Sequence, residues 1–139
     1  MNKLKIYSPN QILLGSFWGG PIAVVYFLYR NYTLLDNNEY AKKTIFLGSF
    51  LILVLLELLP FLPEKFPNMI IPLFYSLLGK QLAIQTQLSK ENINNNENYL
   101  FESNWKIFGI GTLTLFIFLA ISIAIMLGLE SMDFINLTE

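Results

Sequence analysis

Few side chains in this sequence could carry chemistry. The 139 residues include no His and no Cys, which excludes imidazole and thiolate metal ligands, His-dependent triads and disulfides. Glu57 is the one ionisable side chain that lies clearly inside an apolar segment, residues 55–59. A carboxylate within a membrane is a candidate functional group by default. No second carboxylate accompanies it in an apolar segment, so we predict no catalytic residue, no metal site and no cofactor.

Glu57 has two interpretations. It lies about five residues, or roughly 7–8 Å, from the end of its predicted helix, so its carboxylate can extend to the membrane surface. Alternatively, it belongs to a polar site in the outer half of the membrane. The partners expected for that site are Asn10 and Gln11 at the start of the first apolar segment, Asn68 at the start of the third, and Lys65.

The composition indicates a membrane protein. The chain is 54% hydrophobic and 14% charged, whereas soluble domains have about 45–50% apolar and about 25% charged residues. Apolar segments long enough to cross a core of about 30 Å as helices occupy residues 9–29, 44–62 and 107–129, and a weaker segment, interrupted by Lys80, occupies 67–84. We predict an all-α membrane protein with one domain, residues 1–139, and four transmembrane helices. The alternative is three spans and an amphipathic surface helix at 67–84.

The charges of the loops give an orientation, because Lys and Arg concentrate in short cytoplasmic loops. With four spans, six of the nine Lys and Arg residues lie in loops 30–43 and 80–106. Three spans also give six against three, with the N-terminus inside, but place the charges of loop 30–43 outside. We therefore favour four spans. In both arrangements the acidic tail, residues 130–139, lies outside the cell or in the periplasm.

The helix starts suggest an internal repeat. Ser8, Pro9 and Gln11 have the pattern of an N-cap, a first-turn proline and a capping box. The Pro-Asn pair at residues 9–10 recurs 58 residues later, at 67–68. This repeat predicts two tandem helical hairpins whose Pro-Asn starts both lie outside. A chance likeness of such a short motif is the alternative.

Small residues indicate where helices can pack closely in a membrane. One stripe recurs every fourth residue at Gly15, Gly19 and Ala23, and a second lies near the end of the sequence at Ala120, Ala124 and Gly128. Each stripe either packs against another helix of the same chain or forms the seam of a homo-oligomer.

Proline and glycine predict a change of helix direction inside the first span. Gly19, Gly20 and Pro21 are consecutive, and Pro21 removes a backbone hydrogen bond, which predicts a kink. A discontinuous helix that exposes its backbone to a substrate is the alternative. Pro72 in the third segment gives that alternative some support.

Three short segments resemble a family of small uncharacterised bacterial polytopic inner-membrane proteins. They are residues 7–11 (YSPNQ), 62–68 (LPEKFPN) and 103–111 (SNWKIFGIG). The resemblance implies a multi-pass protein of the bacterial inner, or cytoplasmic, membrane. It implies no activity.

The residues favour a non-catalytic integral membrane protein that acts by partner binding, as an accessory subunit or a toxin-immunity protein. The expected partners are the lipid bilayer and another membrane or secreted protein, with homo-oligomerisation left open. A small transporter or an oligomeric channel is the alternative, suggested by Glu57, Pro72 and the Gly-Gly-Pro sequence at residues 19–21. A nucleic-acid partner is not expected, because the net charge is −1 and the sequence has no basic stripe.

Overall fold

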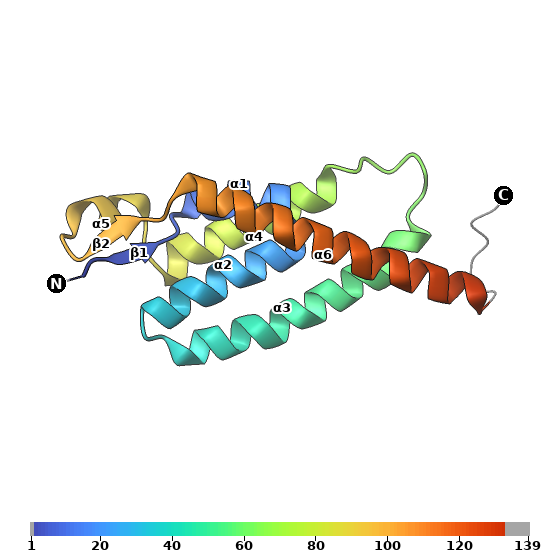
Figure 1. Cartoon of the computed structure of the whole chain (residues 1–139), viewed down its shortest axis with the longest axis horizontal. Helices are drawn as coiled ribbons and strands as arrows, with labels where there is room; N and C mark the ends of the chain where they lie inside the picture. Colours follow the sequence, from blue (N-terminus) through green and yellow to red (C-terminus); the bar gives the residue numbers. More distant parts are fainter. Residues whose placement is uncertain (1, 133–139) are drawn as a thin grey trace.

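Figure 1 shows the computed structural model, which describes residues 2–132 as an elongated helical bundle. The all-α class is confirmed. The part of the predicted acidic tail that follows Met132 lies outside the described residues. The helices are α1 (Pro9–Gly19), α2 (Pro21–Leu34), α3 (Asn38–Leu58), α4 (Ile70–Thr86), α5 (Lys90–Asn95) and α6 (Asn104–Ser131); a 3-10 turn (Leu59–Phe61) follows α3, and two strands, β1 (Leu4–Ile6) and β2 (Tyr99–Phe101), precede α1 and α6.

The first apolar segment is a helical hairpin, and the expectation of one continuous helix over residues 9–29 is wrong. Gly20 has φ 85°, a left-handed value that glycine adopts without strain, and Pro21 starts a new helix. The chain reverses here, so α2 runs back beside α1 (Figure 1). As a result the backbone N–H of Tyr7, before α1, donates to Oδ1 of Asn31, near the end of α2, at 3.0 Å. The break is therefore a reversal and not a kink.

The other long helices run lengthwise along this hairpin. The α3 helix packs on α2, and α6 packs on both α1 and α2 (Figure 1). The α4 helix returns antiparallel to α1 and buries Tyr75, Ser76, Gly79 and Ala83. Both strands, α5 and the turn at residues 35–37 lie at one end of the bundle, here called the sheet end. The loop of residues 62–69 and the end of α6 lie at the other, here called the loop end.

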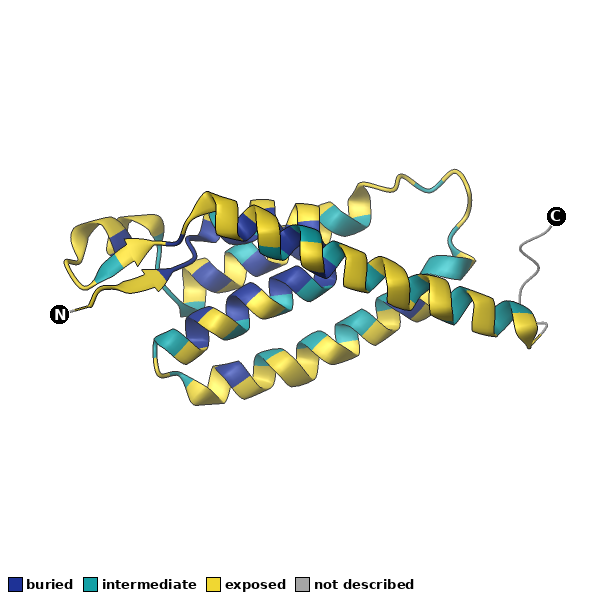
Figure 2. Ribbon diagram, viewed as in Figure 1, coloured by how far each residue is buried: buried dark blue, intermediate teal, exposed yellow. Residues whose placement is uncertain are grey.

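Two helical segments are long and apolar enough to cross a membrane. They are Asn38–Phe61, which includes the 3-10 turn, and Asn104–Ser131. Only 11% of the most apolar part of each is buried, so their side chains face outward, as Figure 2 shows for α3 and for most of α6. The prediction of four transmembrane helices is not supported by these lengths. A span needs about 20 residues, whereas α1 and α2 have 11 and 14 residues and α4 has 17.

The expected tandem hairpins do not form. The first Pro-Asn start lies at the sheet end and the second at the loop end, because α1 and α4 are antiparallel. Their local structure also differs. Ser8 and Gln11 form the predicted capping box, whereas Met69, which precedes α4, provides no side-chain cap.

A parallel pair of strands, absent from the sequence prediction, joins the starts of α1 and α6. Leu4 pairs with Tyr99 and Ile6 with Phe101. Each strand leads within three residues into its helix. The pair therefore brings the first turns of α1 and α6 together, although they are almost a hundred residues apart in the sequence.

The first small-residue stripe lies at the closest helix contacts. A methyl group added at Gly15 would be 2.7 Å from Ile107, and one added at Gly19 would be 2.7 Å from both Ala23 and the backbone of Gly111. Ala23 itself is fully buried. These three positions allow α1 to pack closely against α2 and α6.

The second stripe packs against nothing in the part of the chain that the structure describes. Ala120, Ala124 and Gly128 are exposed, and a Cβ added at Gly128 would have no neighbour within 4 Å. The buried residues of α6 are instead Ile107, Gly111 and Thr114, in its first half. Packing against residues 2–132 therefore does not account for this stripe.

Candidate functional site

The polar site predicted around Glu57 is not assembled. Asn10 and Gln11 lie at the sheet end, because α1 starts there, while Glu57 is exposed near the loop end of α3. Asn68 and Lys65 share the loop end with Glu57 and are also exposed. Among residues 2–132, Glu57 forms neither an ion pair nor a hydrogen bond. The prediction failed because the hairpin moves the start of α1 to the opposite end of the molecule.

Gln11 holds the starts of α1 and α6 together. Its side-chain amide donates to the backbone oxygen of Glu102 and to Oδ1 of Asn104, both at 2.8 Å. The Glu102 carboxylate is 7% exposed and accepts hydrogen bonds from Lys106 at 2.7 Å and from the backbone N–H of Ser103 at 3.1 Å. Burial opposes its ionisation, but these bonds and the lysine charge outweigh burial and lower the pKa of Glu102. The Gln11 amide therefore links the two helix starts, whereas the Glu102 carboxylate forms its bonds within the first turn of α6.

A second link, missed by the sequence analysis, closes the hairpin at Asn31. This side chain is 1% exposed. Its amide nitrogen donates to the backbone oxygen of Tyr7 and to Oε1 of Gln87, both at 2.8 Å, and Gln87 in turn donates to the backbone oxygen of Leu28 at 3.0 Å. Asn31 follows an apolar segment beside Arg30, where a polar residue resembles the start of a loop, so the sequence carried no signal of its burial.

The interior offers no polar route along the bundle. Among the described residues Glu102 is the only buried side chain that carries a charge, and it lies at the sheet end. The other buried polar side chains are Ser8, Ser16, Asn31, Ser76 and Thr114. Residues 2–132 also contain no cluster of three or more His, Cys, Asp or Glu side chains that could hold a metal ion.

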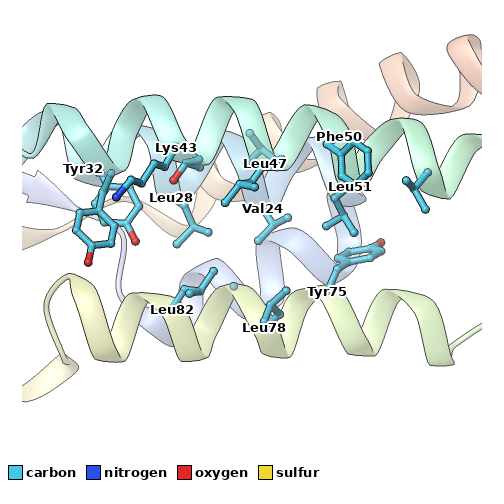
Figure 3. Close-up of a pocket in the computed structure, with 16 residues that line it drawn as sticks. Val24, Leu28, Tyr32, Lys43, Leu47, Phe50, Leu51, Tyr75, Leu78 and Leu82 are labelled. Atoms are coloured by element: carbon cyan, nitrogen blue, oxygen red, sulfur yellow. The ribbon is translucent and has the colours of Figure 1, made fainter.

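An apolar groove of about 450 Å³ separates α3 from α4, with α2 as its floor (Figure 3). The groove exists because α3 packs on α2 and α4 packs on α1 and α2, which leaves α3 and α4 apart. It is lined by Val24, Val25, Leu28 and Tyr32 of α2, by Tyr40, Lys43, Thr44, Leu47, Gly48, Phe50, Leu51 and Val54 of α3, and by Tyr75, Leu78, Gly79 and Leu82 of α4.

Most polar groups of this groove lie at its sheet end, and the hydroxyl of Tyr75 lies toward the other end. The hydroxyls of Tyr32 and Thr86 share a hydrogen bond, and the rings of Tyr32 and Tyr40 stack with centroids 5.4 Å apart. The Lys43 ammonium lies 5.4 Å from the centre of the Tyr40 ring and 2.6 Å from a carboxylate oxygen of Glu39. The groove thus has a cationic, hydroxyl-bearing mouth and an apolar interior.

A smaller cavity of about 220 Å³ lies beside the tip of the hairpin, toward the loop end. Its lining includes Pro21, Asn68 and Pro72, three residues singled out from the sequence, together with Tyr75 and Phe118. Pro72 does not kink α4, because it lies in the first turn, where a backbone N–H has no partner within the helix. The cavity brings these residues together without adding a charged group.

The second half of α6 is a helical surface without a partner in the described chain. This helix has 28 residues, or about 42 Å, and the small-residue stripe lies in the part beyond its buried positions (Figure 2). Large apolar side chains surround the stripe and are exposed: Phe116 (66%), Ile117 (43%), Ile123 (57%) and Leu127 (57%).

Comparisons with protein-family models, with curated proteins and with solved structures found no match for this chain. Its function therefore has to be argued from the groove, the cavity and the exposed helix faces.

Proposed function

We propose that this chain is a multi-pass integral membrane protein in which α3, α4 and α6 cross the bilayer and the α1–α2 hairpin enters it from the sheet end and returns. The lengths support this arrangement. With 11 residues, α1 is about 16–17 Å long, roughly half of a 30 Å hydrocarbon core. Its tip is buried at Gly19, Gly20 and Pro21, as a break in helical backbone at membrane depth must be.

The hairpin also makes the charge distribution more uneven. Because it brings the N-terminal segment to the sheet end, only Lys65 remains at the loop end. Lys and Arg favour the cytoplasmic side. The proposed orientation therefore has the sheet end in the cytoplasm and the end of α6 outside. The bacterial inner membrane remains the proposed location. The eight cations near the sheet end are Lys3, Lys5, Arg30, Lys42, Lys43, Lys80, Lys90 and Lys106.

Labelling of single cysteines tests this topology, because the chain has no native Cys. In intact cells, a membrane-impermeant maleimide should label Lys65→Cys and should label Lys3→Cys and Asn94→Cys only after permeabilisation. All three positions are exposed. Labelling of position 3 from outside would contradict the re-entrant hairpin, because it would place the N-terminal segment on the side that four full spans require.

Within the membrane, the proposed function is non-catalytic binding of another membrane protein through the second half of α6. The observation that carries it is the exposed stripe at Ala120, Ala124 and Gly128. Between membrane helices lipid provides no hydrophobic drive, so small residues that allow close approach mark association faces. The first stripe of this chain is used in that way within the bundle, at Gly15 and Gly19. The second is left free for a helix from outside the described chain.

Photocrosslinking in native membranes tests this proposal. A photoreactive residue at Ile117, beside the stripe, should give a discrete protein adduct, and one at Leu119, equally exposed on another side of α6, should not. Adding Ala124→Leu should remove the adduct by blocking close approach. The adduct's mass distinguishes a second copy from a different protein. An adduct from both positions, or one that survives Ala124→Leu, would reject this face.

A small transporter or oligomeric channel is the second candidate, favoured by the hairpin tip beside the 220 Å³ cavity. Transport of an ion needs polar or charged groups along its path. The described lining of the cavity is mostly apolar, and Glu57 does not contribute to it. This candidate therefore ranks below partner binding.

A further inference from the structure

We propose that the groove between α3 and α4 binds one acyl chain of an anionic phospholipid, with the lipid phosphate at Lys43. This inference rests on the proposed membrane position of the chain but not on the partner face of α6. The depth of the groove, its walls and its mouth each favour a phospholipid acyl chain with an anionic headgroup.

The depth of the groove matches one leaflet. Along α3 its lining extends from Tyr40 to Val54, and the part from Lys43 to Val54 has a rise of 11 residues, or about 16–17 Å. Half of a hydrocarbon core about 30 Å thick is about 15 Å. A chain whose headgroup lies at Lys43 therefore reaches the far end of the groove, near Tyr75, at about the bilayer midplane.

The walls of the groove suit a hydrocarbon chain. Leu47 and Leu51 of α3 face Leu78 and Leu82 of α4 across the gap (Figure 3), and Leu47 and Leu78 are 61% and 42% exposed. The two glycines of the lining allow α3 and α4 to approach α2 closely, because their added Cβ atoms would collide with the valines of the floor. Away from the sheet end, the one hydroxyl among the described lining residues is that of Tyr75.

The packing of the walls argues against a partner helix as the occupant. A helix is about 10 Å in diameter with its side chains, and both walls of the groove already contact the floor helix α2. Widening the groove would require α3 or α4 to leave α2. A single unbranched chain needs no such movement.

The mouth selects an anionic headgroup. The groove and the surrounding lipid are both apolar environments for an acyl chain. A preference for one lipid therefore has to come from its headgroup. Lys43 provides a cation with three donors, and Tyr40 and the Tyr32–Thr86 hydroxyl pair lie beside it. Glu39 competes for Lys43 at 2.6 Å, but this pair is exposed to solvent and therefore weak.

Native mass spectrometry of the purified full chain in detergent tests the groove with two lipids that share the same acyl chains, phosphatidylglycerol and phosphatidylcholine. The unchanged chain should retain more phosphatidylglycerol. Leu78→Trp, which fills the groove, should reduce retention of both lipids severalfold. Leu77→Trp is the matched control, because residue 77 is similarly exposed but does not line the groove. Equal losses in the two variants would overturn the proposal.

The headgroup contact is tested separately. Lys43→Gln should lower the ratio of phosphatidylglycerol to phosphatidylcholine about fivefold, the effect of one basic residue at a lipid surface. Lys42→Gln, its neighbour outside the groove, should leave the ratio unchanged, and Glu39→Gln should raise it. A ratio that is the same in both lysine variants would overturn the proposal even if Leu78→Trp does not fold. If the chain prefers phosphatidylglycerol but position 3 is labelled from outside the cell, the proposed topology is rejected and the proposal of lipid binding in the groove is retained.

Discussion

Gly19→Leu should destabilise the chain more than any other single substitution on α1. A Cβ at this position would lie 2.7 Å from Ala23, from the backbone of Gly111 and from the hydroxyl of Thr114. The Thr114 hydroxyl can rotate away from such a clash, but the Ala23 Cβ and the Gly111 backbone can move only if α2 and α6 shift away from α1. Overpacking of a core typically costs about 1–3 kcal/mol, and we expect the upper part of that range. The measurement is thermal unfolding of the purified chain in detergent.

Ala124→Leu is the matched control for this substitution. It also adds a bulky side chain at a small residue in a predicted packing stripe, but Ala124 is exposed in the structure. Its unfolding temperature should equal that of the unchanged chain, while its crosslinking should be lost as described above. If Ala124→Leu lowered the unfolding temperature as much as Gly19→Leu, the second half of α6 would have a partner within the chain.

Asn31→Leu should have an effect at least as large, because it removes the side chain that closes the hairpin. The substitution leaves three partners without their bonds, namely the backbone N–H and oxygen of Tyr7 and the side-chain oxygen of Gln87. Each buried polar group left without a partner costs about 1–3 kcal/mol. We therefore expect a loss of about 3 kcal/mol or more in the free energy of unfolding. Faster hydrogen exchange at the Tyr7 amide should accompany it.

Thr33→Val provides the control on the same helix. The Thr33 hydroxyl donates to the backbone oxygen of Tyr29 at 2.9 Å, but the bond is exposed and lies within one turn of helix. Surface substitutions of this kind usually change stability by less than about 0.5 kcal/mol. A loss of stability as large as that of Asn31→Leu would mean that the end of α2, and not the buried amide of Asn31, closes the hairpin.

Local features of the structure follow from the sequence by itself. The helical class follows from long apolar segments with little charge, and the capping box of α1 follows from Ser8 and Gln11, because its hydrogen bonds join residues three apart. The position of the break in the first segment also follows from adjacent glycine and proline, which limit the backbone whatever surrounds them. These are short-range effects, decided within one or two turns.

Only the tertiary structure decided the direction of the chain after Gly20. A Gly-Pro break permits a kink or a complete reversal, and the reversal depends on buried contacts between distant residues, such as those of Asn31 with Tyr7 and Gln87. That reversal separates Gln11 from Glu57 and dismantles the predicted polar site. Similarly, both small-residue stripes have the same spacing, but only the first meets another helix of the chain. The groove between α3 and α4 has no sequence signal, because its two walls are distant in the sequence and their shared contact with α2 places them.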